Sequence, residues 1–171
     1  MRKIIYFLMI IGLVAGSVFL LRKPDSLSNA YCAFCDPAVL ARQAFYEDGL
    51  VLALYTHKPI LPGHCLIIPK RHVERFEGLS KEEELQMSEL IKKVNHAAMK
   101  VFGTSAYLLL QKNGHEVGQT VPHVHFHYVP RKAGDSSSLK FILKMYLADL
   151  RGPISSAEMQ EIVEKMKQAM E

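Results

Sequence analysis

The chain has 171 residues, of which 49% are hydrophobic and 22% are charged, and these proportions are typical of one globular domain with a hydrophobic core. Four of its 21 basic residues lie within the first 23 positions, which leaves 17 basic residues against 17 acidic residues in the rest of the chain. The length excludes two large domains, and the balanced charge argues against a nucleic-acid polymer as a partner.

The first 23 residues differ in composition from the rest of the chain. An apolar stretch over residues 4–21 is preceded by Arg2-Lys3 and followed by Arg22-Lys23. Such a stretch is just long enough to cross a bilayer as a helix, and no clear Ala-x-Ala cleavage site follows it. We therefore expect an N-terminal transmembrane helix, with a cleaved secretory signal as the alternative. The expected division is a membrane anchor or signal-like leader at 1–23, a linker at 24–30 and the folded domain at 31–171.

Three strands are predicted in the first half of this domain. Residues 43–47 and 50–55 flank Asp48-Gly49, a pair typical of a two-residue hairpin turn because it accommodates positive φ angles. Residues 64–68 form a short apolar run after Pro62-Gly63, and we expect them to be the third strand.

A long amphipathic helix is predicted next, over residues 85–102. Ser80 and Glu83 have the spacing of a capping box, and Gly103 is a typical helix stop. The apolar positions fall on one helical face, and they are Met87, Leu90, Ile91, Val94, Ala97, Ala98 and Val101.

Two further strands and a last helix complete the predicted fold. The strands are expected at 106–111 and 123–129, and the helix at 157–170. The segment 139–150 is rich in large apolar residues, and it is expected either to cover a site as a helix or to form a partner surface. The predicted fold class is α+β, with an antiparallel sheet of about five strands and helices packed against it.

The clearest sign of chemistry is the run Pro122–Pro130, in which His123, His125 and His127 alternate with apolar residues. Alternate side chains of a strand leave the same face, so the three imidazoles are expected to line up on one side. A stripe of histidines on a solvated strand is the alternative. The polar residues found nearby favour a reactive site.

These polar residues lie at predicted strand ends, beside glycine-containing loops. Gln119 and Thr120 shortly precede the histidines, Gln111 ends the strand before them, and His64 begins a strand upstream. Amide and hydroxyl groups in such positions suit a phosphate that needs hydrogen-bond donors but no permanent cation. Each residue is a weak signal alone, because Gln119 fits a surface amide and His64 fits a partly buried, hydrogen-bonded histidine.

Cysteine usage indicates metal binding or free thiols rather than disulfide bonds. Three cysteines occur, and Cys32 and Cys35 have the Cys-x-x-Cys spacing that lets two sulfurs bind one metal ion. Such a site needs two more ligands, and a pair of buried, metal-free thiols is the alternative. Cys65 lies in an apolar strand and is expected to be a small core residue.

The sequence resembles the histidine triad family, whose signature of three histidines separated by single apolar residues matches His123 to His127. The resemblance covers roughly residues 32–170, and residues 118–135 look most like the fragile histidine triad dinucleoside polyphosphate hydrolases. It implies an α+β catalytic domain that transfers a nucleotidyl group in two steps. His125 attacks an α-phosphorus, and water or another acceptor then releases the nucleotide from a nucleotidyl-histidine.

The resemblance also implies roles for the residues around the nucleophile. His127, Gln119 and Gln111 match residues that contact the phosphate, and His64 matches a histidine that supports the triad. Thr56 stands where that branch has a substrate-contacting asparagine, which weakens the transfer of its substrate preference to this chain.

The missing metal ligands and a partner follow from the resemblance as well. In many bacterial histidine triad proteins two histidines complete the Cys-x-x-Cys site, and they match His72 and His123 here. A closed site of two cysteines and two histidines implies structural zinc, and the chemistry requires no organic cofactor. A homodimer is implied by the resemblance alone.

Three classes of function fit these features. The first is a nucleotide hydrolase or transferase of the dinucleoside polyphosphate type, with nucleoside phosphoramidate hydrolysis as an alternative reaction. The second is a non-catalytic, nucleotide-binding regulatory module, and the third is a membrane-bound metal-binding protein. Free thiols and a nucleotide substrate belong in a reducing compartment. The expected location is therefore a bacterial inner membrane, crossed once, with the catalytic domain in the cytoplasm, and secretion after signal cleavage is the alternative.

Overall fold

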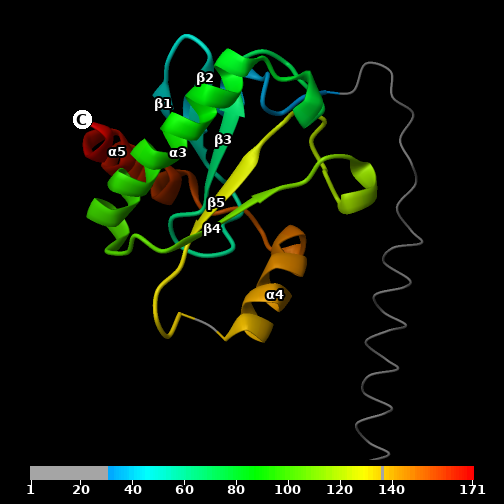
Figure 1. The fold of residues 1–171 in the computed structure, drawn as a ribbon. Coiled ribbons are helices and arrows are strands. Elements are labelled where there is room, and N and C mark those ends of the chain that lie inside the picture. Colours follow the sequence, from blue (N-terminus) through cyan, green and yellow to red (C-terminus); the bar gives the residue numbers. More distant parts are fainter. Residues whose placement is uncertain (1–30, 136) are drawn as a thin grey trace, which may run out of the picture. The chain divides into compact units, whose positions relative to one another are not determined.

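The computed structural model describes residues 31–135 and 137–171 of the chain (Figure 1). At the centre is an antiparallel sheet of five strands in the order β1-β2-β3-β5-β4. The strands are β1 (Ala44–Glu47), β2 (Val51–Tyr55), β3 (Cys65–Pro69), β4 (Tyr107–Gln111) and β5 (Phe126–Pro130). The α-helices of the described residues are α2 (Pro37–Gln43), α3 (Lys81–Phe102), α4 (Ser138–Tyr146) and α5 (Ser156–Met170). The α+β domain with a five-stranded antiparallel sheet is as predicted.

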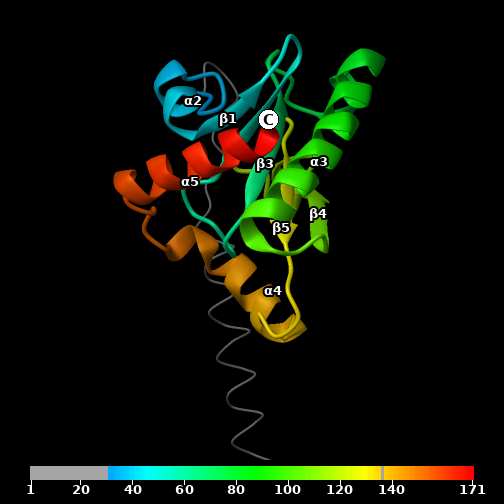
Figure 2. The same cartoon turned by 90° about the vertical axis from the view of Figure 1, so that its left-hand side faces the viewer.

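The sheet buries a different set of side chains on each of its faces. Helices α3 and α5 are both packed against the sheet (Figure 2). On the face that they cover, Val51 and Ala53 of β2 join their hydrophobic cluster. On the other face, Leu52 and Leu54 pack with Phe34 from the segment before α2. Successive side chains of a strand point to opposite faces, so β2 is apolar throughout because both of its faces are covered.

The predicted long helix is confirmed as α3, and it begins earlier, at Lys81. The Oγ of Ser80 accepts a hydrogen bond from the N–H of Glu83, and the Glu83 carboxylate accepts one from the N–H of Ser80. The predicted capping box is therefore complete. Gly103 ends the helix with a φ of 69°, a left-handed conformation that a residue without a Cβ adopts at little cost.

The predicted hairpin forms between β1 and β2, but its turn is built differently. Gly49 is not among the described glycines with positive φ. Instead, the Oδ1 of Asp48 accepts hydrogen bonds from the N–H groups of Leu50 (2.8 Å) and Val51 (2.9 Å). A side-chain acceptor that satisfies two backbone donors closes the turn without a left-handed glycine.

β5 begins later than predicted, at Phe126, so His123 and His125 precede the strand. The pairing of β5 with β3 also ends at Phe126. The N–H of Val124 donates instead to the carbonyl oxygen of Val73 (2.6 Å), which lies beyond the end of β3. This bond draws the segment before β5 away from the ladder.

The segment 139–150, for which the sequence left two roles open, forms α4 and a short 3-10 helix at Ala148–Leu150. Phe141 fixes α4 to the domain, because it is buried with Ile60, Leu61 and Val129. Met145 and Ala148 line the cavity that holds the candidate site.

The predicted membrane-spanning helix at 1–23 lies outside the described residues. In residues 31–135 and 137–171, no helix combines the length and the apolar character needed to cross a membrane. The predicted architecture is therefore corrected to the five-stranded α+β domain that the described residues form. The inner-membrane location that we inferred from that helix is corrected with it.

Candidate functional site

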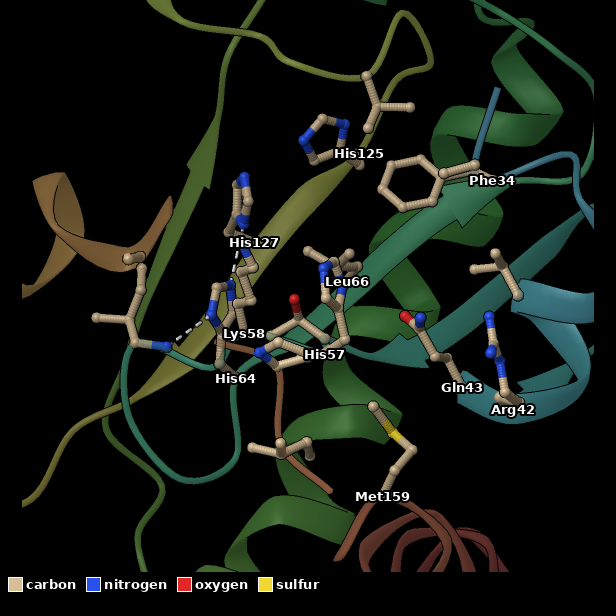
Figure 3. Close-up of a pocket in the computed structure, with 18 of the residues that line it drawn as sticks. Phe34, Arg42, Gln43, His57, Lys58, His64, Leu66, His125, His127 and Met159 are labelled. Carbon is tan, nitrogen blue, oxygen red and sulfur yellow. Dashed lines mark hydrogen bonds between the residues drawn. The ribbon is translucent and has the colours of Figure 1, made fainter. Parts of the chain in front are cut away.

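A cavity of about 880 Å³ lies beside the histidine run (Figure 3). His64, His125 and His127 line it, so the structure brings together the three predicted catalytic residues. Much of the remaining wall comes from α2, α5 and the loops at the ends of β2 and β4, and Met145 and Ala148 complete one side of it. His123 is fully buried and does not line the cavity.

His64 and His127 form a hydrogen-bonded pair whose protons can be assigned. The N–H of Ile60 donates to His64 Nδ1 (3.2 Å), so this nitrogen is an acceptor and the proton of the neutral ring lies on Nε2. His64 Nε2 lies 3.0 Å from His127 Nδ1 and donates to it. His127 therefore carries its own proton on Nε2, which makes the group that it offers a ligand an N–H donor.

His125 has the opposite tautomer. Its Nδ1 lies 2.7 Å from the carbonyl oxygen of His123 and donates to it, because a carbonyl oxygen only accepts. The Nε2 of the neutral ring then holds a lone pair. The centroids of the His125 and His127 rings are 4.8 Å apart. A lone pair and an N–H donor thus lie side by side at one cavity.

Burial favours the neutral form of all three rings at the cavity. Burial, followed by repulsion from His125, lowers the pKa of His64 to about 3. Burial and then His64 lower the pKa of His127 to about 2. Burial also lowers the pKa of His125, although the hydrogen bond to the His123 carbonyl opposes this effect. Neutral imidazole is the nucleophilic form of histidine.

The predicted phosphate-binding residues other than His127 occupy different surroundings. Thr120 is exposed and lines the cavity. Gln119 is buried, its Oε1 accepts from the N–H of Gly114 (2.7 Å), and its Nε2 donates to the carbonyl of Glu74 (2.9 Å). Gln111 donates to the carbonyl of the next residue and lies outside the cavity lining. Gln119 thus holds the loop before the histidines, and phosphate contact by Gln111 and Gln119 stays a prediction.

Lys112 is a candidate that the sequence pattern did not single out. It lines the cavity, its Nζ lies 3.3 Å from the carbonyl oxygen of Gly118, and its charge contributes to the lowered pKa values of His125 and His127. The sequence contained one sign of this role, because Lys112 lies between the end of a predicted strand and a glycine-containing loop. An ammonium group here can neutralise part of the charge of a polyphosphate.

The predicted metal ligands Cys32, Cys35, His72 and His123 converge in a second cluster. One ligand atom from each residue lies within 4.8 Å of all the others. Cys32 Sγ is 3.4 Å from His123 Nδ1, and Cys35 Sγ is 3.3 Å from His72 Nδ1. The Nε2 of His123 donates to the carbonyl of Pro69 (2.9 Å), which leaves Nδ1 unprotonated toward the sulfurs, as metal binding requires.

The chemistry of this donor set fits a divalent metal ion. Burial, followed by the neighbouring Cys32 thiol, raises the pKa of Cys35 to about 11. The Cys35 thiol therefore resists ionisation by itself, and a cation bound to its sulfur reverses this preference. The cluster can thus hold a metal ion.

Comparison with known proteins assigns the family. The HIT domain model matches residues 38–134, a range that contains His64, His72 and the histidine run. The chain belongs to the HIT family. A bis(5'-nucleosyl)-tetraphosphatase (asymmetrical) of Schizosaccharomyces pombe is 44% identical to this HIT protein over 95 residues, which are 56% of this chain and 52% of that protein. The chain thus spans about half the length of that relative.

Two further similarities bear on the site. A bifunctional bis(5'-adenosyl)-triphosphatase/adenylylsulfatase of Arabidopsis thaliana is 35% identical over 122 residues, which are 71% of this chain and 67% of that protein. The crystal structure of a Zn-bound histidine triad family protein from Mycobacterium smegmatis has a TM-score of 0.63 at 25% identity. This match covers 81% of the present chain and 92% of the other.

Proposed function

We propose that this HIT protein is a hydrolase that cleaves dinucleoside polyphosphates through a covalent nucleotidyl-histidine intermediate. The opposite tautomers of His125 and His127, which place a lone pair beside an N–H donor at one cavity, carry the proposal. The two hydrolases to which the chain is 44% and 35% identical support this class of substrate.

In the first step, the lone pair of His125 Nε2 forms a bond to the α-phosphorus, and the bond from this phosphorus to the bridging oxygen breaks. The leaving group departs with that electron pair as a nucleoside polyphosphate. His127 Nε2–H and the Lys112 ammonium bind the phosphate oxygens, which stabilises the charge that develops there. The His123 carbonyl keeps its hydrogen bond to Nδ1–H and stabilises the positively charged ring of the intermediate.

In the second step, water attacks the same phosphorus, and the bond between phosphorus and Nε2 breaks. The electron pair of this bond returns to His125, and the proton lost by the water passes to solvent. The product is a nucleoside monophosphate, and the enzyme is again neutral at His125. Each cycle consumes one water molecule and uses no organic cofactor.

A substrate panel tests this function directly. The purified protein is incubated with diadenosine tri- and tetraphosphate, an adenosine phosphoramidate and adenylyl sulfate, and the products are separated and counted. The dinucleotides should turn over faster than the phosphoramidate, and in ¹⁸O-labelled water the label should enter the nucleoside monophosphate alone. Tight binding of these compounds without turnover of any would contradict the enzyme and indicate a regulatory module.

We also propose that the ion held by the cysteine–histidine cluster is zinc, in a structural role. Two thiolates and two imidazoles form a closed tetrahedral set for zinc, without an open position for water. The Zn-bound relative of 25% identity supports this choice of metal. When bound, zinc supplies a cross-link between the segment before α2 and the sheet, and it fixes His123, whose carbonyl orients His125.

A homodimer formed through β4 is a further proposal. β4 lies at one edge of the sheet, and three successive residues in it, Tyr107, Leu108 and Leu109, are 38–40% exposed. An edge strand with exposed apolar side chains is a site at which a second chain can pair.

The oligomeric state can be measured by light scattering. The parent protein should have the mass of two chains, and Leu108→Lys should shift it toward one chain. Leu85→Lys makes the same change at a 61% exposed position of α3 and should leave the mass unaltered. A monomeric parent would contradict the dimer.

A further inference from the structure

Gln43, the last residue of α2, is a buried polar side chain that the proposed reaction does not use. It is 7% exposed and lines the cavity. Within residues 31–135 and 137–171, its side-chain amide makes no hydrogen bond. Figure 3 shows the amide end of Gln43 turned into the cavity, near Arg42 and Met159. No fully buried side-chain nitrogen or oxygen of the described residues lacks a partner, so the Gln43 amide is accessible from the cavity. It is therefore available to pair with a polar group of a ligand bound there.

The cavity wall around this amide is largely apolar and is continuous with the reactive histidines. Phe34, Val39, Leu66 and Met159 are buried and line the cavity. Leu66 lies opposite His127 in the pairing of β3 with β5, and the Phe34 ring lies 5.1 Å from that of His125. Arg42, Gln160, Glu164 and Lys167 also line the cavity. Apolar walls with a small number of polar groups are typical of a site for a small organic ligand such as a heterocycle. A nucleotide whose phosphate lies at His125 would place its base in this part of the cavity.

We propose that Gln43 is a specificity-determining residue, whose amide recognises the hydrogen-bonding edge of an adenine base. The inference rests on the proposed function, because it requires a nucleotide with its phosphate at the histidines. An amide offers an N–H donor and an oxygen acceptor side by side, and adenine offers the complementary 6-amino donor beside a ring-nitrogen acceptor. The N7 edge of guanine offers two acceptors, so only one of the two hydrogen bonds forms with it.

Equilibrium binding of three nucleotides isolates this contact. AMP, GMP and purine riboside monophosphate, which lacks the 6-amino group, are titrated calorimetrically into the full-length parent and into Gln43→Met. The methionine keeps the approximate size of the side chain and removes its hydrogen-bonding groups. The parent should bind AMP about three- to tenfold more tightly than purine riboside monophosphate, the value of one net hydrogen bond. In Gln43→Met this ratio should fall to about one, with a Tm close to that of the parent.

Two further variants keep the test decisive. Gln86→Met makes the same chemical change at an exposed position of α3 and should retain the parent ratio. Gln43→Glu keeps an acceptor for the 6-amino group, so it should preserve the preference for AMP over purine riboside monophosphate, even where Gln43→Met is too unstable to titrate. An unchanged ratio in Gln43→Met, or a lost preference in Gln43→Glu, would overturn the proposal.

The result is separable from the hydrolase proposal, because binding of a nucleoside monophosphate requires no turnover. Loss of the AMP preference in Gln43→Met, in a protein that cleaves no dinucleotide, would support base recognition and refute the hydrolase. Turnover of dinucleotides with the AMP preference unchanged in Gln43→Met would support the hydrolase and refute base recognition by Gln43.

Discussion

His123 and His125 are separated by one residue, yet the structure prepares them for different chemistry. His123 donates through Nε2 to the carbonyl of Pro69, so its Nδ1 faces the sulfur atoms of the cysteine pair. His125 donates through Nδ1 to the carbonyl of His123, so its Nε2 keeps the lone pair. The difference shows that the backbone acceptor, and not the spacing of the histidines, decides which ring nitrogen each residue presents.

The metal cluster also influences His125, whereas nothing in the geometry of the described residues makes the metal cluster depend on the His125 side chain. The side chain of His123 belongs to the metal cluster, and its carbonyl orients His125. Damage at His125 should therefore affect the chemistry alone, whereas damage at the metal cluster should affect stability first and the chemistry second. Both expectations can be measured.

The largest expected effect is that of His125→Ala on turnover. Without the nucleophile, kcat for the dinucleotide should fall by at least about 10⁴-fold. His127 presents an N–H donor to the cavity, so no described group replaces the lone pair of His125 Nε2. AMP affinity and Tm should change little, because this ring acts in bond making more than in binding. Steady-state kinetics, calorimetry and thermal unfolding measure the three quantities.

The exposed residue His115, which lies outside the cavity lining, provides the control for this variant. His115→Ala should keep the parent kcat. If His125→Ala retains activity within about tenfold of the parent, a difference of only about 1.4 kcal/mol, His125 is not the nucleophile.

Loss of the metal should have a smaller effect on turnover and a larger one on stability. The purified protein should contain about one zinc ion per chain, and Cys35→Ser or a strong chelator should remove it. We expect Tm to fall by about 10 °C or more, because several kcal/mol of cross-linking energy are lost. The kcat of the remaining folded protein should fall by about tenfold or more through the misplaced His123 carbonyl.

Cys65→Ala is the matched control for the cysteine variant, because Cys65 is buried in the core away from the cluster. It should keep the metal, whatever its effect on Tm. A metal-free parent with full activity would refute the structural zinc, and unchanged kcat after metal loss would refute the coupling through His123.

Much of the fold was predictable because its signals are local. The capping box at Ser80 and Glu83, the αL conformation of Gly103 and the apolar face of α3 each depend on residues within one or two helical turns. Alternation predicted a shared face for the histidine run, and His125 and His127 do line one cavity. His123 is buried outside that cavity, and His64 completes it from a different segment.

The features that could not be predicted depend on contacts distant in sequence. The start of β5 is set by the bond from Val124 to Val73, and the surroundings of Gln119 are set by Gly114 and Glu74. The contribution of Gln43 to the cavity depends on the packing of α2 beside the sheet and α5. A sequence pattern gives the faces of a helix but does not say which other element lies next to them.

The smallest expected effect concerns the pH dependence of stability, and it separates the paired histidines from an exposed one. The pKa values of His64 and His127 are about 3 and about 2 in the folded protein, against 6.5 for an unperturbed histidine. Below pH 6.5 the unfolded chain binds protons that the folded chain does not bind. The free energy of unfolding must therefore fall as pH decreases from 6.5 to 4.5, by up to about 1.4 kcal/mol per pH unit for each residue.

Urea unfolding over this pH range measures the effect as the slope of the free energy of unfolding against pH. His64→Gln should show a clearly shallower slope than the parent. His96→Gln, at an exposed position of α3, should keep the parent slope, and acid release of the metal affects all three proteins alike. Equal slopes in His64→Gln and the parent would show that His64 titrates normally, and burial would then not be what keeps its ring neutral.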